Sequence, residues 1–176
     1  IIRGLVGSEM CIRDRGKPGE LCIKGYSVMK EYWKNKTETK KAIDKDGWMR
    51  TGDLVLMRDD GYLEIVGRIK DTIIKGGENI YPREVEEFLI KIDQIEQAYV
   101  FGVPDKTYGE IVGCWVKLEK NKIISENEIE NKCKNKIASF KIPSFFRIVD
   151  EFPMTASGKV QKFKMSEKEI ALKINK

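Results

Sequence analysis

The sequence predicts an α+β fold in which a small antiparallel β subdomain is followed by a small α+β domain. Three observations predict it. Short apolar runs near the N-terminus are separated by Gly and Asp turn signals. After Gly67 the pattern changes, and strands alternate with helices to the C-terminus. The length of 176 residues suits one domain or two small ones, and an apolar content of 41% supports a hydrophobic core.

The first unit is expected at residues 16–66. Residues 1–15 have no initiator Met and no clear period, and we expect a non-native segment there, with a native strand and turn as the alternative. Asp59-Asp60-Gly61 predicts a hairpin turn between two apolar runs. The predicted elements are a strand over 19–29, a polar helix over 35–44, and strands over 54–57 and 62–66.

The second unit is expected at residues 67–176. Pro82 suits the first position of a helix, and Ser125 with Glu128 predicts a capping box at the start of another. The two predicted apolar helix faces carry Val85, Phe88, Leu89 and Ile92, and then Ile129, Cys133 and Ile137. The other predicted elements are strands over 72–74, 97–103, 110–118 and 145–149, a loop over 153–159, and a terminal helix near 164–174.

The charge pattern argues against nucleic acid as a partner. Lys and Arg total 33, Asp and Glu total 28, and the two signs alternate along much of the chain, which is typical of a solvated surface. The sequence contains no histidine, which excludes Ser-His triads, Cys-His nucleophiles and His-containing zinc sites. We expect no metal site built by this chain alone.

The cysteines and the hydropathy favour a cytoplasmic location. The four cysteines form no CxxC pair, and Cys22 and Cys114 lie in strand-like apolar runs, where we expect buried free thiols. No apolar run approaches the roughly 18 residues that a transmembrane helix needs. No signal peptide is visible either.

The segment PMTASGKVQK, residues 153–162, contains a Gly-Lys pair that suggests phosphate. A P-loop needs a Gly five residues before this pair and a Ser or Thr after the Lys, but positions 153 and 160 are Pro and Val. The loop therefore presents Lys159 as a flexible cation without a glycine-rich phosphate cradle. An ordinary exposed lysine is the alternative.

Four segments stand in order: GELCIKGYSVMKEYW (19–33), GWMRTGDL (47–54), GRIKDTIIKGGENIYPREVE (67–86) and PMTASGKVQK. Together they resemble the C-terminal part of the AMP-forming acyl-CoA synthetases, of the adenylate-forming superfamily. GGENIYPREVE with SGKVQKFKM looks most similar to the fatty-acyl or medium-chain branch. The resemblance covers residues 16–176. It implies that 16–66 form the last β subdomain of an incomplete AMP-binding N-terminal lobe, and that 67–176 form the C-terminal lid.

The resemblance implies a ligase that joins a carboxylic or fatty acid to the α-phosphate of ATP, releases pyrophosphate, and transfers the acyl group to CoA. Lys159 matches the catalytic lysine, which also contacts ATP. Asp53 matches the residue that binds the ATP ribose, with a turn-capping role as the alternative. Arg68 matches an arginine that contacts ribose or phosphate, with a salt bridge to Asp71 or a solvated side chain as the alternative.

The resemblance also implies two poses of the lid. Lys70 matches the hinge position about which the lid rotates between half-reactions. Lys75, Gly76, Gly77 and Glu78 match the segment beside the CoA pantetheine tunnel, where glycines allow close approach. An ordinary turn is the alternative for Gly76-Gly77. Magnesium would be held mainly by the ATP phosphates and by the missing lobe.

The family's phosphate loop and acyl pocket belong to the N-terminal lobe, and this chain shows no such loop. We therefore expect the chain alone to be inactive, as a fragment of a ligase or a lid awaiting its missing lobe. Two other function classes stay open: a stand-alone interaction module that keeps the lid fold without catalysis, and a basic nucleic-acid binder. Within the ligases, an aryl or short-chain acid is the alternative substrate.

Overall fold

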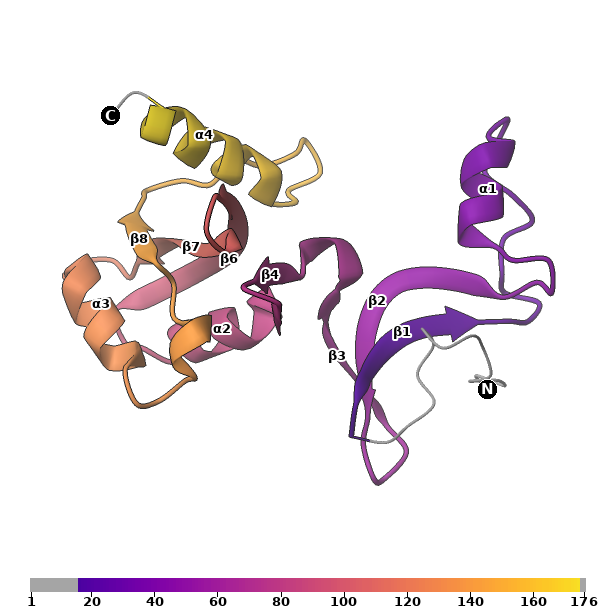
Figure 1. Cartoon of the computed structure of the whole chain (residues 1–176), viewed down its shortest axis with the longest axis horizontal. Helices are drawn as coiled ribbons and strands as arrows, with labels where there is room; N and C mark the ends of the chain where they lie inside the picture. Colours follow the sequence, from indigo (N-terminus) through magenta and orange to yellow (C-terminus); the bar gives the residue numbers. More distant parts are fainter. Residues whose placement is uncertain (1–15, 175–176) are drawn as a thin grey trace. The chain divides into compact units, whose positions relative to one another are not determined.

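The structure, a computed structural model, describes residues 16–174, so the expectation for residues 1–15 lies outside the described part. The chain divides between Lys70 and Asp71 into two compact units, which we call the N-terminal unit and the C-terminal unit (Figure 1). The sequence suggested the end of the first unit at residue 66, and the structure adds strand residues and a short 3₁₀ turn, Ile69–Asp71, around the division. The structure is α+β, as the sequence predicts.

The N-terminal unit is a three-stranded antiparallel sheet with one short helix. The strands lie in the order β1-β2-β3, and Val55 and Cys22 are its buried apolar side chains. The bounds are β1 (Pro18–Ile23), α1 (Lys36–Ala42), β2 (Met49–Met57) and β3 (Leu63–Arg68). β1 ends at Ile23 rather than at residue 29, because Ile23 pairs with Met49, the first residue of β2, and the chain then turns.

The hairpin turn expected at Asp59-Asp60-Gly61 is present. Arg58 N donates to Tyr62 O over 2.9 Å, and Asp60 Oδ1 accepts from Tyr62 N over 3.1 Å. Gly61 has a φ of +85°, which favours glycine. β2 begins at Met49, five residues before the predicted strand over 54–57, and therefore places Asp53 inside the sheet.

The C-terminal unit is built on a five-stranded sheet in the order β5-β4-β7-β6, with β8 paired to β7. The strands are β4 (Ile73–Lys75), β5 (Glu78–Ile80), β6 (Ile95–Asp105), β7 (Gly109–Leu118) and β8 (Phe145–Ile148). The sequence analysis missed β5, which is only three residues long. β8 runs parallel to β7 after the crossover through α3, a pairing that the sequence does not predict.

Three helices complete this unit: α2 (Pro82–Leu89), α3 (Glu126–Cys133) and α4 (Lys162–Ile174). Pro82 is the first residue of α2, and the Ser125–Glu128 capping box starts α3, both as predicted. α2 and α3 end before Ile92 and Ile137, although both residues still pack in the core beyond the helix ends. α4 begins two residues earlier than predicted.

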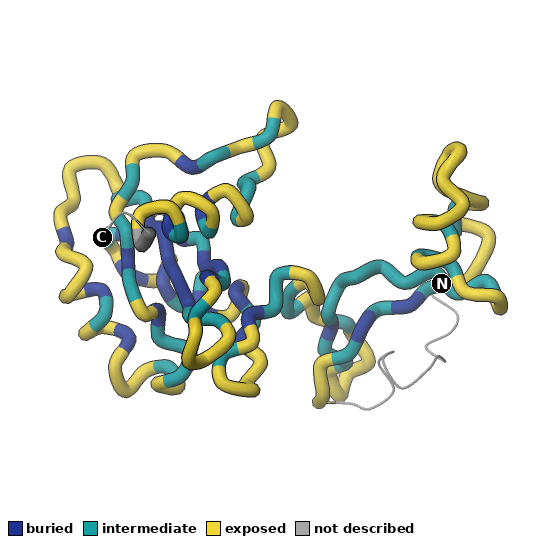
Figure 2. Tube along the Cα trace, turned by 45° about the horizontal axis from the view of Figure 1, so that its top comes forward, coloured by how far each residue is buried: buried dark blue, intermediate teal, exposed yellow. Residues whose placement is uncertain are grey.

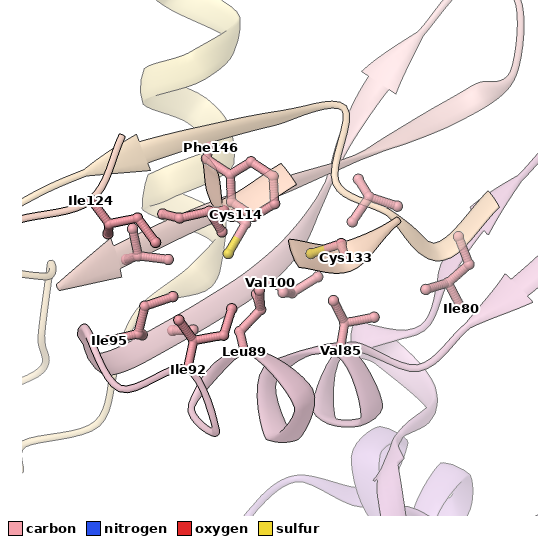
Figure 3. Close-up of a cluster of buried hydrophobic side chains, with 14 of the residues drawn as sticks. Ile80, Val85, Leu89, Ile92, Ile95, Val100, Cys114, Ile124, Cys133 and Phe146 are labelled. Atoms are coloured by element: carbon pink, nitrogen blue, oxygen red, sulfur yellow. The ribbon is translucent and has the colours of Figure 1, made fainter. Parts of the chain in front are cut away.

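The sheet of the C-terminal unit is covered on both faces. Side chains of β6 alternate between two clusters, because successive residues of a strand point to opposite faces. Ala98 and Val100 join the cluster beneath α2 and α3 (Figure 3), whereas Phe101 and Val103 join the cluster beneath α4. Figure 2 shows the buried positions concentrated in the strands and inner helix faces.

The expectation of buried free thiols is confirmed for one of the two cysteines and wrong for the other. Cys114 is a buried free thiol, as predicted, and Cys133 is another in the same cluster. Cys22 is buried but disulfide-bonded, so the expectation of a free thiol is wrong for this residue. Within residues 16–174, no helix is both long and apolar enough to cross a membrane.

Candidate functional site

Asp53 and Arg68 meet in the N-terminal unit. They are register partners on β2 and β3, and Arg68 Nε donates to Asp53 Oδ1 over 3.0 Å. The sequence analysis assigned both residues to the same nucleotide but weighed Asp71 as the ionic partner of Arg68. The ion pair seen in the sheet is with Asp53. A carboxylate and a guanidinium side by side can accept from a diol and donate to a phosphate from one place.

A buried carboxylate holds the irregular part of β2 before Asp53, where the register with β1 shifts. Glu20 is 5% exposed, and its Oε1 accepts from Gly52 N over 3.2 Å. Thr51 Oγ1 donates to Leu21 O over 2.8 Å and accepts from Asp53 N over 3.1 Å. Gly52 has a φ of +73°, which a residue with a side chain rarely adopts. The sequence analysis missed Glu20, although an acidic residue inside an apolar strand was the signal.

A pocket of about 690 Å³ opens beside this irregular part of β2, within the N-terminal unit. Glu20, Gly52, Arg68 and Lys70 are among the residues that line it. The pocket therefore gathers one buried carboxylate and two of the cations that the sequence analysis selected. Lys70 is exposed, lies in the 3₁₀ turn after β3, and is the last residue before the division between the units.

Gly76 and Gly77 form the two-residue turn of the β4–β5 hairpin. Lys75 and Glu78 are register partners, and the glycines between them have φ values of +58° and +89°. A type I′ hairpin turn requires positive φ at both central positions, which explains the Gly-Gly pair. An added Cβ on Gly77 would have no neighbour within 4 Å, so the outer side of the turn is open. Lys75 Nζ points to Phe140 O, 3.3 Å away.

Lys159 lies on a tight hairpin between β8 and α4. Thr155 N donates to Lys159 O over 2.8 Å, and Lys159 N donates to Thr155 Oγ1 over 3.0 Å. Gly158 has a φ of +77° at the tip, and Met154 pairs with Val160 below it. The Lys159 side chain is exposed. The Thr, Gly and Lys of the PMTASGKVQK segment thus have local structural roles that present one ammonium group to solvent.

α4, which follows this hairpin, is tied to the sheet by a buried carboxylate. Glu169 is 5% exposed, accepts from Trp115 Nε1 over 2.7 Å, and binds Arg147 of β8 through both of its oxygens. The hydrogen bonds that Arg147 donates to the Glu169 carboxylate raise the pKa of the guanidinium above its ordinary value. The middle of α4 is therefore held on the sheet.

Asp53, Arg68 and Lys70 belong to the N-terminal unit, whereas Lys75 to Glu78 and Lys159 belong to the C-terminal unit. Across the described residues, no group of three or more His, Cys, Asp or Glu side chains is arranged to hold a metal ion.

The chain matches known proteins along most of its length. Residues 84–159 match the family model of the AMP-binding enzyme C-terminal domain. The chain is 52% identical over 158 residues to the putative acyl-CoA synthetase YngI of Bacillus subtilis (strain 168), covering 90% of this chain and 29% of that protein. It is 47% identical to the mitochondrial medium-chain acyl-CoA ligase ACSF2 of Rattus norvegicus, covering 85% of this chain and 24% of that protein. The chain thus spans less than a third of these relatives.

Solved structures agree with the sequence relatives. ATP-bound MatB from Rhodopseudomonas palustris matches with a TM-score of 0.83 and 35% identity, covering 89% of this chain and 31% of that chain. The o-succinylbenzoate CoA synthetase MenE from Bacillus subtilis, in complex with its acyl-adenylate intermediate, matches with a TM-score of 0.82 and 33% identity, covering 91% and 32%. The chain therefore carries an AMP-binding enzyme C-terminal domain, its sequence relatives are acyl-CoA synthetases, and its structural neighbours are adenylate-forming enzymes.

Proposed function

We propose that this chain is the C-terminal part of an ATP-dependent acyl-CoA synthetase, an acid-thiol ligase, and that it is inactive without the rest of that enzyme. The observation that carries the proposal is the match of nine tenths of the chain to an acyl-CoA synthetase at 52% identity. The exposed Lys159 hairpin and the Asp53–Arg68 pair support it, because they offer charge of the sign that a nucleotide and a carboxylate require.

The first half-reaction that we propose joins two anions. A carboxylate oxygen attacks the α-phosphorus of ATP, the bond to the β-phosphate breaks, and pyrophosphate leaves. Negative charge builds on the oxygens around the α-phosphorus, and the Lys159 ammonium would stabilise it. Asp53 would accept hydrogen bonds from the ribose hydroxyls, and Arg68 would donate to ribose or phosphate. Magnesium would be held mainly by the ATP phosphates and by groups outside this chain.

The second half-reaction would transfer the acyl group to CoA. The CoA sulfur attacks the acyl carbon of the adenylate, the bond to the AMP oxygen breaks, and AMP leaves. We propose that Lys75, Gly76, Gly77 and Glu78 line the pantetheine path, because the open side of the glycine turn leaves room for a thin ligand. Lys70 would be the hinge between the two poses, since the two compact units divide directly after it.

The acid that we propose is a fatty or medium-chain acid, as the name of the rat relative suggests. An aryl acid is the second candidate, because MenE, which carries o-succinylbenzoate in its name, is a close structural neighbour. We propose a cytoplasmic location: the free thiols of Cys114 and Cys133 favour it, whereas the disulfide at Cys22 counts against it.

Substitution of Lys159 tests the proposal. In the longer enzyme, or in this chain combined with the remainder of the Bacillus subtilis relative, Lys159→Ala is expected to slow acid-dependent ATP–pyrophosphate exchange by roughly 10²- to 10³-fold. Thioester formation from a supplied acyl-adenylate should change far less. Lys164→Ala, an exposed lysine on α4, is the matched control. Normal exchange in Lys159→Ala, or acyl-CoA production by this chain alone, would contradict the proposal.

A further inference from the structure

The orientation of the Lys159 hairpin is set by the residues that join it to the sheet and to α4. The hydrogen bonds that shape residues 154–160 run within the hairpin, from Thr155 N and Gly158 N to carbonyls of the same loop. At Gly158, an added Cβ would have no heavy atom within 4 Å, so the tip projects into open space. The orientation of Lys159 relative to its unit is therefore set where the two arms of the hairpin join the sheet and α4.

One arm of the hairpin is fixed by packing. Phe152 is 8% exposed and meets Tyr99 edge to face, with 4.7 Å between the ring centroids. The arms are closed by a hydrogen bond of 2.8 Å from Gln161 N to Pro153 O. The next residue along the second arm is Lys162, the first residue of α4.

The second arm is fixed by an ion pair. Lys162 Nζ lies 2.6 Å from Glu86 Oε1 on α2, and both side chains are largely buried, at 25% and 17% exposed. The same Glu86 oxygen accepts from Val100 N over 2.7 Å. Val100 lies on β6, the end strand of the sheet, so Glu86 satisfies an edge N–H group that would otherwise lack a strand partner. The Glu86–Lys162 pair thereby joins α2, the sheet edge and the base of the hairpin.

We propose that Glu86 is a positioning residue for Lys159, acting through Lys162. This inference rests on the proposed function of Lys159. Glu86 lies on the helix that begins at Pro82, shortly after the Gly76-Gly77 turn. α2 therefore follows one of the two segments to which we assign a half-reaction, and the ion pair couples the direction of the other, the Lys159 hairpin, to this helix.

The rest of α4 does not depend on this pair. Ser166 Oγ donates to Gly102 O over 2.8 Å, Met165 is fully buried, and Glu169 binds Trp115 and Arg147. Loss of the Glu86–Lys162 attraction should therefore loosen the first turn of α4 and the hairpin while the helix stays docked. Glu86→Gln is suited to the test, because the amide oxygen can still accept from Val100 N.

Amide hydrogen exchange of the 176-residue chain tests the positioning directly. We expect Glu86→Gln and Lys162→Met to speed exchange at Thr155, Gly158 and Gln161 by roughly 5- to 30-fold, the factor that corresponds to one or two kcal/mol. Lys162→Arg, which keeps the charge, should recover most of the protection. Glu87→Gln is the matched control, because Glu87 lies on the same helix and pairs with exposed Arg83. Unchanged exchange in both Glu86→Gln and Lys162→Met would overturn the inference.

The half-reactions separate this inference from the proposed function. In the complete enzyme we expect Glu86→Gln to lower the rate constant of ATP–pyrophosphate exchange by roughly 10- to 100-fold, with a smaller change in the KM for ATP and in thioester formation. Slow ATP–pyrophosphate exchange in Lys159→Ala together with normal ATP–pyrophosphate exchange in Glu86→Gln would overturn the positioning role alone. Normal exchange in Lys159→Ala would overturn the proposed function, and the positioning role with it.

Discussion

Asp53 and Arg68 lie opposite each other on β2 and β3, with 3.0 Å between Arg68 Nε and Asp53 Oδ1. Their side chains are 26% and 58% exposed, so solvent screens the pair and its contribution to stability is at most about 1 kcal/mol. The arrangement contributes little to the fold. Its value lies in holding a hydrogen-bond acceptor and a planar cation at one point on the sheet surface.

We therefore expect Asp53→Asn to affect ATP binding more than stability. In the complete enzyme the KM for ATP should rise by roughly 10- to 100-fold, since a hydrogen bond to a charged group contributes about 1.5–3 kcal/mol. The free energy of unfolding should fall by less than about 1 kcal/mol. Asp60→Asn is the control, because Asp60 also pairs with an arginine, Arg58, but at the distal turn. An unchanged KM would remove Asp53 from the nucleotide site.

Gly77 offers a test of the proposed CoA segment. Gly77→Ala places a methyl group in open space but keeps a φ of +89°, which costs an L-residue about 1–2 kcal/mol. Gly61→Ala matches it closely, since Gly61 has a φ of +85° and is equally open, yet lies in the β2–β3 turn. We expect similar losses of unfolding free energy in the two variants. Only Gly77→Ala should slow thioester formation, and equal rates would contradict the assignment.

The Glu169 network should be a main source of stability in the C-terminal unit. Glu169→Ala leaves Trp115 Nε1 without its carboxylate and Arg147 without its ionic partner, so we expect a loss of about 2–4 kcal/mol. The expected loss of unfolding free energy is smaller than for a fully buried ion pair, because the Arg147 side chain is 40% exposed. Chemical denaturation measures it, with Glu167→Ala on the exposed face of α4 as control. Equal losses in the two variants would show that the network is dispensable.

The sequence predicted those elements whose signals are local. Pro82 and the Ser125–Glu128 pair start their helices because N1 proline and capping boxes act within one turn. The three-residue strand β5 and the parallel pairing of β8 were missed, because they depend on partners far along the chain. The expectation of a free thiol at Cys22 was wrong for a similar reason, since a disulfide leaves no local pattern in the sequence.

The residues of the candidate site also differ in whether their signal is local in the sequence or depends on the fold. Lys159, Asp53 and Arg68 could be proposed from the sequence because they stand in motifs with fixed spacing. Glu20 and Glu86 were not, because each acts on a segment brought near by folding: Glu20 on Gly52 N, and Glu86 on Val100 N and Lys162. Their signal was an acidic side chain inside an apolar strand, for Glu20, or beside the apolar face of an amphipathic helix, for Glu86; it identifies a carboxylate near the core but not its partner.

Glu128 gives the protein a defined pH dependence. Hydrogen bonds from the Ser125 hydroxyl and backbone N–H lower the pKa of the Glu128 carboxyl below its ordinary value. Because the pKa is lower in the folded state, the stabilisation by the ionised Glu128 is complete above the unfolded pKa of about 4.3 and is lost as the pH falls through the folded pKa.

The difference in unfolding free energy between wild type and Glu128→Gln should thus be largest near neutral pH and should become smaller below about pH 4. Urea unfolding across this range measures it. Glu126→Gln, in the same helical turn but outside the capping box, should show a weaker pH dependence, because Glu126 interacts with the helix dipole and with the charge of Arg147 but not with Ser125. The same pH profile in both variants would assign the effect to the dipole rather than to the hydrogen bonds of Ser125.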